Sequence, residues 1–238
     1  MIVGMIPTFR EGPLAASAIR TLLECCNVVL NFEGPIENAP LDAGARTDLM
    51  ELRKNPKVIA KSGEWKNEVA KRNAMLEFTR RYDPPVWGVF LDGDEILMGA
   101  KWVPDLIWAA EQQKNEDGVS TAAIPLLIQE VDSSVGRIHR VIRLDLLERH
   151  VLSMSQMKFF TSDLVATFPV IPLWRPGMTP TEFARPPMEG EPHIHHRAYY
   201  RPPRRYDFRL HKEEGDEFQK MEREALARMG LIHPSDLA

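Results

Sequence analysis

The chain of 238 residues has only two cysteines, Cys25 and Cys26, which are adjacent in an apolar stretch. Adjacent cysteines can hardly bridge each other, so we expect buried, reduced thiols in a reducing compartment and no disulfide framework. No Cys-x-x-Cys pair occurs, which excludes a zinc ribbon.

A long hydrophobic run is also missing. No stretch of about 18 apolar residues occurs, so no membrane span is predicted. The apolar start, Met1–Pro7, has no basic region before it and no small-residue cleavage site after it, unlike a signal peptide. We therefore expect a soluble, cytoplasmic protein.

The sequence has no excess of basic charge. Lys and Arg number 30 against 34 Asp and Glu, and the net charge of −4 excludes a protein that coats DNA through its overall charge. With 44% hydrophobic and 27% charged residues, the composition is that of a folded protein and excludes a disordered chain or a collagen-like fibre.

Short apolar runs and helical patterns alternate along the first half of the chain. Met1–Ile6 and Val28–Phe32 are typical of buried strands, and between them apolar residues recur at helical spacing from Gly12 to Cys25. This order is the βαβ unit of a parallel sheet, in which ligands bind at the carboxyl ends of the strands. Further strands are expected over Lys57–Ala60, Val86–Leu91, Ala122–Gln129, Arg137–Leu144, Phe159–Trp174 and His193–Tyr200, and further helices over Glu64–Tyr82, Val103–Gln113 and Asp216–Met229.

The sharpest local feature is Asp92-Gly93-Asp94-Glu95, which follows the apolar strand Val86–Leu91. Three carboxylates in four residues repel one another unless a cation or hydrogen-bond donors lie among them. Oxygen ligands of this kind suit Mg²⁺ or Mn²⁺, which proteins hold with a few carboxylates and the phosphates of a substrate. Gly93 permits a sharp turn and the close approach of a ligand. A solvated acidic turn is the alternative, and the position after a parallel strand favours the functional interpretation.

Three segments of the first 100 residues carry further motifs: Met1–Glu11, Trp65 with Lys71–Leu76, and Phe90–Leu97. They resemble, in the same order and spacing, the opening strand and loop, the helix before the metal motif, and the D-x-D strand end of the family-two glycosyltransferases. The resemblance implies the α/β GT-A fold, a Rossmann-like, mixed, mostly parallel sheet flanked by helices, in a single domain over residues 1–238. Residues 1–100 would bind the nucleotide-sugar, and residues 101–238 would form the acceptor half, with a C-terminal lid and helix.

The same resemblance implies roles for individual residues. Asp94 would bind the metal that bridges the diphosphate, and Asp92 would contact the ribose or the water shell of the metal. Arg10 stands where the family often has Asn, and Glu33 where an Asp meets the base, so the donor base and sugar stay open, with a UDP-sugar favoured. The residues expected to bind the nucleotide-sugar are Pro7, Thr8, Arg10, Glu33, Arg72, Asp92 and Gly93.

A histidine cluster, His193-Ile194-His195-His196, is the second feature. In a strand, His195 shares a face with His193, and His196 points to the other face. Imidazole is a good ligand for Mn²⁺, and several members of the family supply a late histidine to the metal. Partly exposed surface histidines are the alternative interpretation. The expected metal ligands are Asp92, Asp94, His195 and His196.

Arginines recur from Arg197 to Arg209 and are interleaved with Tyr199, Tyr200 and Tyr206. The planar guanidinium bonds two phosphate oxygens at once, so this segment could hold a diphosphate, and basic residues with aromatics also suit a nucleic-acid backbone. We favour a lid over the leaving diphosphate; a solvated face is the other alternative.

The general base is the least defined part of the site. An inverting transferase needs a carboxylate that takes the proton of the acceptor hydroxyl. Asp163, Glu189 and Glu191 are candidates by their location in the sequence only.

The leading hypothesis is therefore a metal-dependent inverting glycosyltransferase of the hexosyl-transferring type, which uses a nucleotide-diphospho-sugar and Mn²⁺ or Mg²⁺. Its acceptor would be a hydroxyl of a glycan, lipid, protein or modified nucleic acid. Sugar nucleotidyltransferases share a similar fold, but they usually carry a Gly-rich, Arg-containing loop after the first strand, which Pro7–Glu11 is not. A non-enzymatic nucleic-acid-binding module leaves the acidic Asp92–Glu95 segment unexplained.

Overall fold

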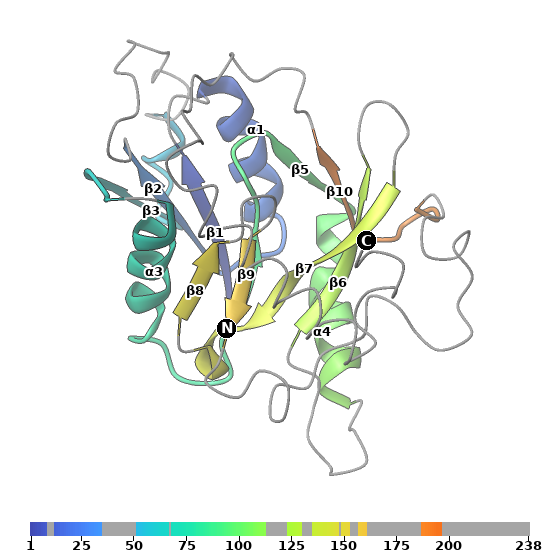
Figure 1. Cartoon of the computed structure of the whole chain (residues 1–238). Helices are drawn as coiled ribbons and strands as arrows, with labels where there is room; N and C mark the ends of the chain where they lie inside the picture. The colour runs from blue at the N-terminus through green and yellow to red at the C-terminus, as the bar shows by residue number, and fades with distance from the viewer. Residues whose placement is uncertain are drawn as a thin grey trace, which may run out of the picture.

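A computed structural model of the chain describes residues 1–8, 12–34, 51–66, 68–112, 123–129, 135–147, 149–152, 157–160 and 187–196. These residues form one eight-stranded sheet with strand order β3-β2-β1-β4-β7-β6-β10-β5, and a separate two-stranded sheet of β8 and β9 (Figure 1). Parallel pairs join β3, β2, β1 and β4, while β7 is antiparallel to both of its neighbours. The expected α/β architecture, a mixed, mostly parallel sheet flanked by helices in a single domain, is confirmed.

The elements follow the expected order. The strands are β1 (Ile2–Thr8), β2 (Val28–Glu33), β3 (Val58–Ser62), β4 (Trp87–Phe90), β5 (Glu95–Met98), β6 (Ala123–Gln129), β7 (Val135–Arg143), β8 (Arg149–Leu152), β9 (Met157–Phe160) and β10 (His193–His196). The helices are α1 (Gly12–Leu23), α3 (Glu68–Thr79) and α4 (Val103–Gln112), with short 3₁₀ turns at Ala100–Trp102 and Leu144–Leu146. The expected helix over 216–229 lies outside the described residues.

Two short strands depart from the expectations. The sequence analysis does not predict β5 or β8, because neither has more than four residues and so neither shows a period. The helix expected from Glu64 begins only at Glu68, and Trp65 lies before it and stacks on Phe32. Beyond residue 160, the expected strand over Phe159–Trp174 lies outside the described residues.

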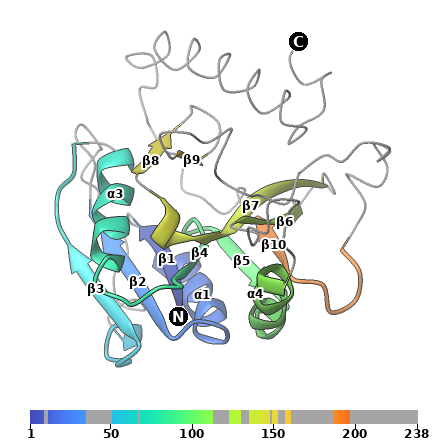
Figure 2. The same ribbon diagram turned by 90° about the horizontal axis from the view of Figure 1, so that it is seen from below.

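The sheet has a helix-covered core on each face. Helices α1 and α4 lie on one face and α3 lies on the other (Figure 2). Alternation along β1 places Ile6 in the core beneath α1, and Val3 and Met5 in the core beneath α3. Cys25 and Cys26 are free thiols buried at the end of α1, as expected, and burial raises the pKa of Cys26. In the described part of the chain, no helix is long and apolar enough to cross a membrane.

The strand pairing determines which loops meet. Thr8 of β1 lies opposite Glu33 of β2, so the carboxyl ends of these parallel strands lie at one edge of the sheet. On the far side of β4, the chain turns through residues 92–94 and enters β5, which pairs with β10 so that His196 lies opposite Glu95. The pairing therefore brings the histidine cluster to the acidic turn, from about 100 residues away in the sequence.

An ion pair beside β4 makes the stability of the fold depend on pH. Arg143 donates to both carboxylate oxygens of Asp145, at 2.9 and 2.5 Å, and the backbone N–H of Val86 donates to Asp145 at 3.0 Å. Burial by itself would raise the pKa of Asp145, but these hydrogen bonds outweigh it and hold the pKa below its ordinary value of 3.8. The pair therefore stabilises the fold above this ordinary value, and the stabilisation is lost as the pH falls through the lowered pKa.

Asp145→Asn is expected to lower the melting temperature at neutral pH and to flatten its decline in acid, because Asn has no carboxylate to protonate. Thermal unfolding of both proteins from about pH 6 to pH 2 measures this difference. Melting curves whose midpoints fall in parallel over the whole range would contradict the assignment.

Candidate active site

The acidic segment forms a closed turn between β4 and β5. The backbone N–H of Glu95 donates to the carbonyl of Asp92 at 3.0 Å, and the backbone N–H of Asp92 donates to Oε2 of Glu95 at 2.7 Å. Gly93, Asp94 and Glu95 are all buried, and Asp94 is 0% exposed. A solvated acidic turn is therefore not what the segment forms.

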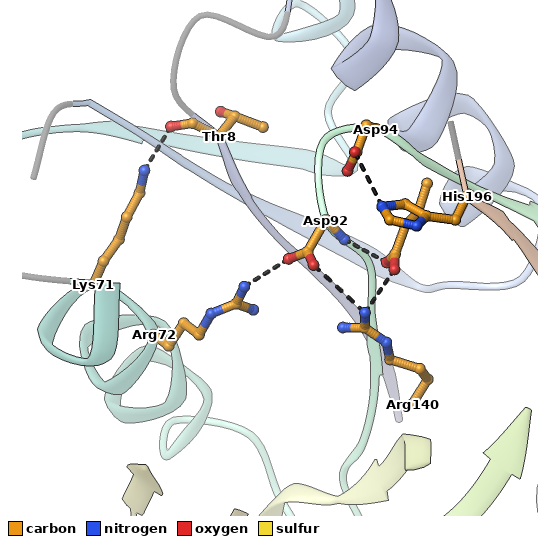
Figure 3. A network of polar contacts seen from close by, with 8 residues as sticks. Thr8, Lys71, Arg72, Asp92, Asp94, Arg140 and His196 are labelled. Atoms are coloured by element: carbon orange, nitrogen blue, oxygen red, sulfur yellow. Dashed lines mark hydrogen bonds and ion pairs between the residues drawn. The ribbon is translucent and has the colours of Figure 1, made fainter. Parts of the chain in front are cut away.

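Two arginines from different elements neutralise the ends of this turn (Figure 3). Arg72 of α3 donates to Oδ1 of Asp92 at 2.6 Å. Arg140 of β7 donates to Oε1 of Glu95 at 2.6 Å and lies 3.5 Å from Oδ2 of Asp92. The repulsion that the sequence analysis expects among the carboxylates is thus relieved by protein cations, of which Arg140 was not anticipated.

Glu95 is almost completely buried, like Asp94. Burial raises its pKa, the guanidinium of Arg140 opposes that rise, and the neighbouring carboxylate of Asp92 adds to it. The ionised form of Glu95 therefore depends on Arg140, the cation in direct contact with it.

Asp94 faces the histidine strand. Its Oδ2 lies 3.2 Å from Nε2 of His196, whose side chain is 20% exposed (Figure 3). His195, the neighbouring residue of β10, points to the other face of the sheet by strand alternation. Of the two candidate histidines, the geometry brings His196 to the acidic turn.

Asp94 and His196 are two donors that a substrate would have to complete in order to hold a metal. Within the residues that the structure describes, no three His, Cys, Asp or Glu side chains are arranged to hold a metal by themselves. Asp92 contacts two guanidinium groups, which leaves a carboxylate and an imidazole facing each other at Asp94 and His196. The carboxylate of Asp94 suits Mg²⁺ or Mn²⁺, which commonly bind one or two protein ligands together with water and substrate phosphates.

A second polar cluster lies at the ends of β1 and β2. Asn31 donates to Oγ1 of Thr8 at 2.8 Å, and Arg53 donates to Oδ1 of Asn31 at 3.0 Å. Arg53 also forms an ion pair with Glu33, which is buried. The Glu33 carboxylate expected at the base therefore already has a cationic partner. The sequence analysis missed Arg53 because only the folded chain brings this residue to the end of β2.

Lys71 joins the ends of the same two strands. Its ammonium donates to the carbonyl of Thr8 at 2.5 Å (Figure 3). It also donates to the carbonyl of Gly34 at 3.1 Å and lies 5.1 Å from the centre of the Trp65 ring. Lys71 is buried, and its ammonium holds the ends of β1 and β2 together.

Two of the candidate general bases, Glu189 and Glu191, lie in the loop before β10. Glu189 is exposed, and Glu191 accepts a hydrogen bond from the backbone N–H of Met188 at 3.0 Å in the loop before β10. His196 ends β10, so Glu191 lies five residues away along an extended chain, or about 16 Å. Asp163 and Arg10 lie outside the described residues, as do residues 197–212 of the expected lid.

Comparisons with known proteins give partial similarity to solved structures. No protein-family model and no curated protein matches the chain. Residues 1–349 of TarS from S. aureus, solved with UDP-GlcNAc, are 12% identical over 69% of this chain and 42% of that one, with a TM-score of 0.36. The mannosyltransferase PcManGT from Pyrobaculum calidifontis, solved with GDP-Man and Mn²⁺, is 14% identical over 54% of this chain and 35% of that one, with a TM-score of 0.39. The chain thus spans less than half of either solved chain.

Proposed function

We propose that the protein is a metal-dependent inverting glycosyltransferase, which moves a sugar from a nucleotide-diphospho-sugar to a hydroxyl acceptor. One observation carries the proposal: a fully buried Asp94 faces His196 at the carboxyl end of a central strand, within a turn held by two arginines. The resemblance of this segment to the D-x-D motif supports the same assignment. Ligands bind at this edge of an α/β sheet.

Asp94 and His196 would hold Mn²⁺ or Mg²⁺, which supplies neutralisation of the charge that develops on the leaving diphosphate. The neighbouring charged residues would bind and orient the nucleotide-sugar. Arg72 keeps Asp92 in place for the ribose, and Lys71 adds positive charge near the strand ends. Asp92, which the sequence analysis expects as a metal ligand, would then accept hydrogen bonds from the ribose or from the water shell of the metal.

The nucleoside would lie across the ends of β1 and β2. Pro7 and Thr8 end β1, and the Glu33–Arg53 pair offers both an acceptor and a donor to the edge of a base. A UDP-sugar is the proposed donor. The general base that takes the proton of the acceptor hydroxyl would be Asp163, Glu189 or Glu191. The proposal also includes the division into a donor half, residues 1–100, and an acceptor half, residues 101–238, and a cytoplasmic location.

A panel of nucleotide-sugars tests this function. UDP, GDP, ADP and CDP, each with Mn²⁺, are compared for their effect on the melting temperature, and the matching nucleotide-sugars are compared for hydrolysis. At a ligand concentration about 100 times the Kd, a ligand that binds only the folded state stabilises it by about 2.7 kcal/mol. This corresponds to a rise of about 5–10 °C for a domain of this size.

The expected result is a rise for one nucleoside diphosphate with Mn²⁺ that exceeds the sum of the two separate effects. Absence of any shift and of any sugar-nucleotide hydrolysis across the panel would overturn the proposed function. Release of inorganic diphosphate from a sugar phosphate and a nucleoside triphosphate would instead identify a nucleotidyltransferase.

A further inference from the structure

Arg140 is a buried cation on the strand that runs antiparallel to β4. Arg140 lies where the pairing of β7 with β6 shifts its register, between the partners of Ile124 and Pro125, and both Arg140 and Arg72 contact the carboxylate of Asp92. Its side chain is 5% exposed, and its Nη2 contacts Glu95 at 2.6 Å and Asp92 at 3.5 Å. Among the described residues, its Nε and Nη1 are buried without a hydrogen-bond partner.

Stability alone is a poor reason for this arrangement. A buried ion pair loses the hydration of both charges, and well-packed apolar residues in its place are often equally stable or more so. The two buried N–H groups without partners add a further cost. Another role for Arg140 is therefore indicated, and its contacts show where that role lies.

The contacts of Arg140 fix both ends of the acidic turn. Glu95 accepts from Arg140 through Oε1 and from the backbone N–H of Asp92 through Oε2, so one guanidinium holds the carboxylate that closes the turn. Asp92 lies between Arg72 and Arg140 through its two oxygens. Asp94 lies between these two anchored residues in the sequence, and its Oδ2 lies 3.2 Å from Nε2 of His196.

We propose that Arg140 is a positioning residue of the donor site: it anchors Asp92 and Glu95 and thereby directs the carboxylate of Asp94 to His196 and to the metal. This inference rests on the proposed function as far as the metal is concerned. The part that concerns the turn itself is independent of any ligand and is tested without one.

The first experiment follows the imidazole signal of His196 in the metal-free protein by NMR, assigned with His196→Gln. Arg140→Met is expected to move this signal to its position in Asp94→Asn, because Asp94 no longer faces the ring. Arg140→Lys keeps a cation that can contact both carboxylates and is expected to restore the signal, at least in part. If Arg140→Met does not fold, Arg140→Gln takes its place.

Arg143→Gln is the matched control. Arg143 belongs to the same strand, and its guanidinium donates to Asp145, which lies outside the acidic turn. It is expected to lower stability and to leave the His196 signal unchanged. A His196 signal that Arg140→Met and Arg140→Gln leave at its wild-type position would overturn the proposal.

A double variant separates positioning from stability. Arg140→Met leaves the Glu95 carboxylate buried without its cation, and Arg140→Met with Glu95→Leu removes both charges, so the double variant is expected to regain much of the lost melting temperature. The His196 signal is expected to stay displaced, because the hydrogen bond from Asp92 to Glu95 is also gone. Recovery of the signal together with stability would show that Arg140 has a structural role only.

Mn²⁺ titration, followed by electron paramagnetic resonance with UDP or GDP present, extends the test to the metal. Loss of a residue that orients a metal ligand typically lowers metal affinity about 10- to 100-fold, and we expect a loss of this size for Arg140→Met and none for Arg143→Gln. A wild-type protein that binds no Mn²⁺, with a His196 signal that still responds to Arg140, would refute the proposed function and leave the positioning role in place.

Discussion

Asp94→Asn is expected to abolish the metal-dependent part of nucleotide binding and to lower transferase turnover about a thousandfold. The amide keeps the shape of the carboxylate but removes the negative charge that faces His196. A metal that neutralises the leaving diphosphate lowers the activation barrier by several kcal/mol. A barrier that is about 4 kcal/mol higher slows the reaction by about three orders of magnitude. Melting curves with UDP or GDP, with and without Mn²⁺, measure the first effect, and turnover of the accepted nucleotide-sugar measures the second.

The same substitution is expected to leave the melting temperature of the metal-free protein unchanged or higher. Asp94 is 0% exposed and shares its turn with two further carboxyl groups, so its charge is costly without a metal. Loss of activity without loss of stability would separate Asp94 from residues that only support the fold. Asp105→Asn, the same change at an exposed position in the first turn of α4, is the control: it is expected to leave activity unchanged and to lower the melting temperature slightly, because a carboxylate there interacts favourably with the helix dipole. A Mn²⁺-dependent shift that survives in Asp94→Asn would exclude Asp94 as a metal ligand.

The regular half of the fold could be predicted because its signals are local. Met1–Ile6 and Val28–Phe32 are mostly apolar, as is typical of strands covered on both faces, and both form strands that have a neighbour on each side in the sheet. The acidic segment could be placed at a strand end for the same reason, because the apolar run before it stops at Leu91. Local composition and periodicity are enough to predict an element when its burial follows a regular pattern along the sequence.

The rest of the candidate site depends on long-range pairing, which leaves no periodic signal. Arg140 belongs to a strand whose alternating charge suggests a half-exposed position, yet its side chain is buried against Glu95. Arg53 pairs with Glu33 across 20 residues, and His196 reaches Asp94 only because β10 inserts between β6 and β5. A choice between His195 and His196 needed this register, which no local pattern contains.

Gly34→Ala is expected to have the largest effect on stability, with a loss of about 3 kcal/mol or more in the free energy of unfolding. Gly34 has a φ of +142°, which favours glycine, and a Cβ built at this position would lie 1.8 Å from the carbonyl oxygen of Gly63. That atom is backbone, held close because the N–H of Gly63 donates to the carbonyl of Glu33 at 3.0 Å. A side chain at residue 34 therefore forces the ends of β2 and β3 apart.

Gly63→Ala is the matched control for this prediction, because it adds the same methyl group on the other side of the same contact. There the Cβ would meet ring atoms of Trp65 at 3.1 and 3.2 Å, and a side chain can move by a few tenths of an ångström where a backbone carbonyl cannot. We expect a cost of about 1 kcal/mol, measured like the first by urea unfolding. Gly34 also accepts from Lys71 and donates its N–H to the carbonyl of Thr8, so its substitution disturbs the strand ends proposed to bind the nucleoside. Nucleotide affinity is therefore expected to fall in Gly34→Ala and to persist in Gly63→Ala. Equal, small losses of stability in the two variants would contradict the prediction, because they would show that the ends of β2 and β3 can move apart to accept a side chain at residue 34.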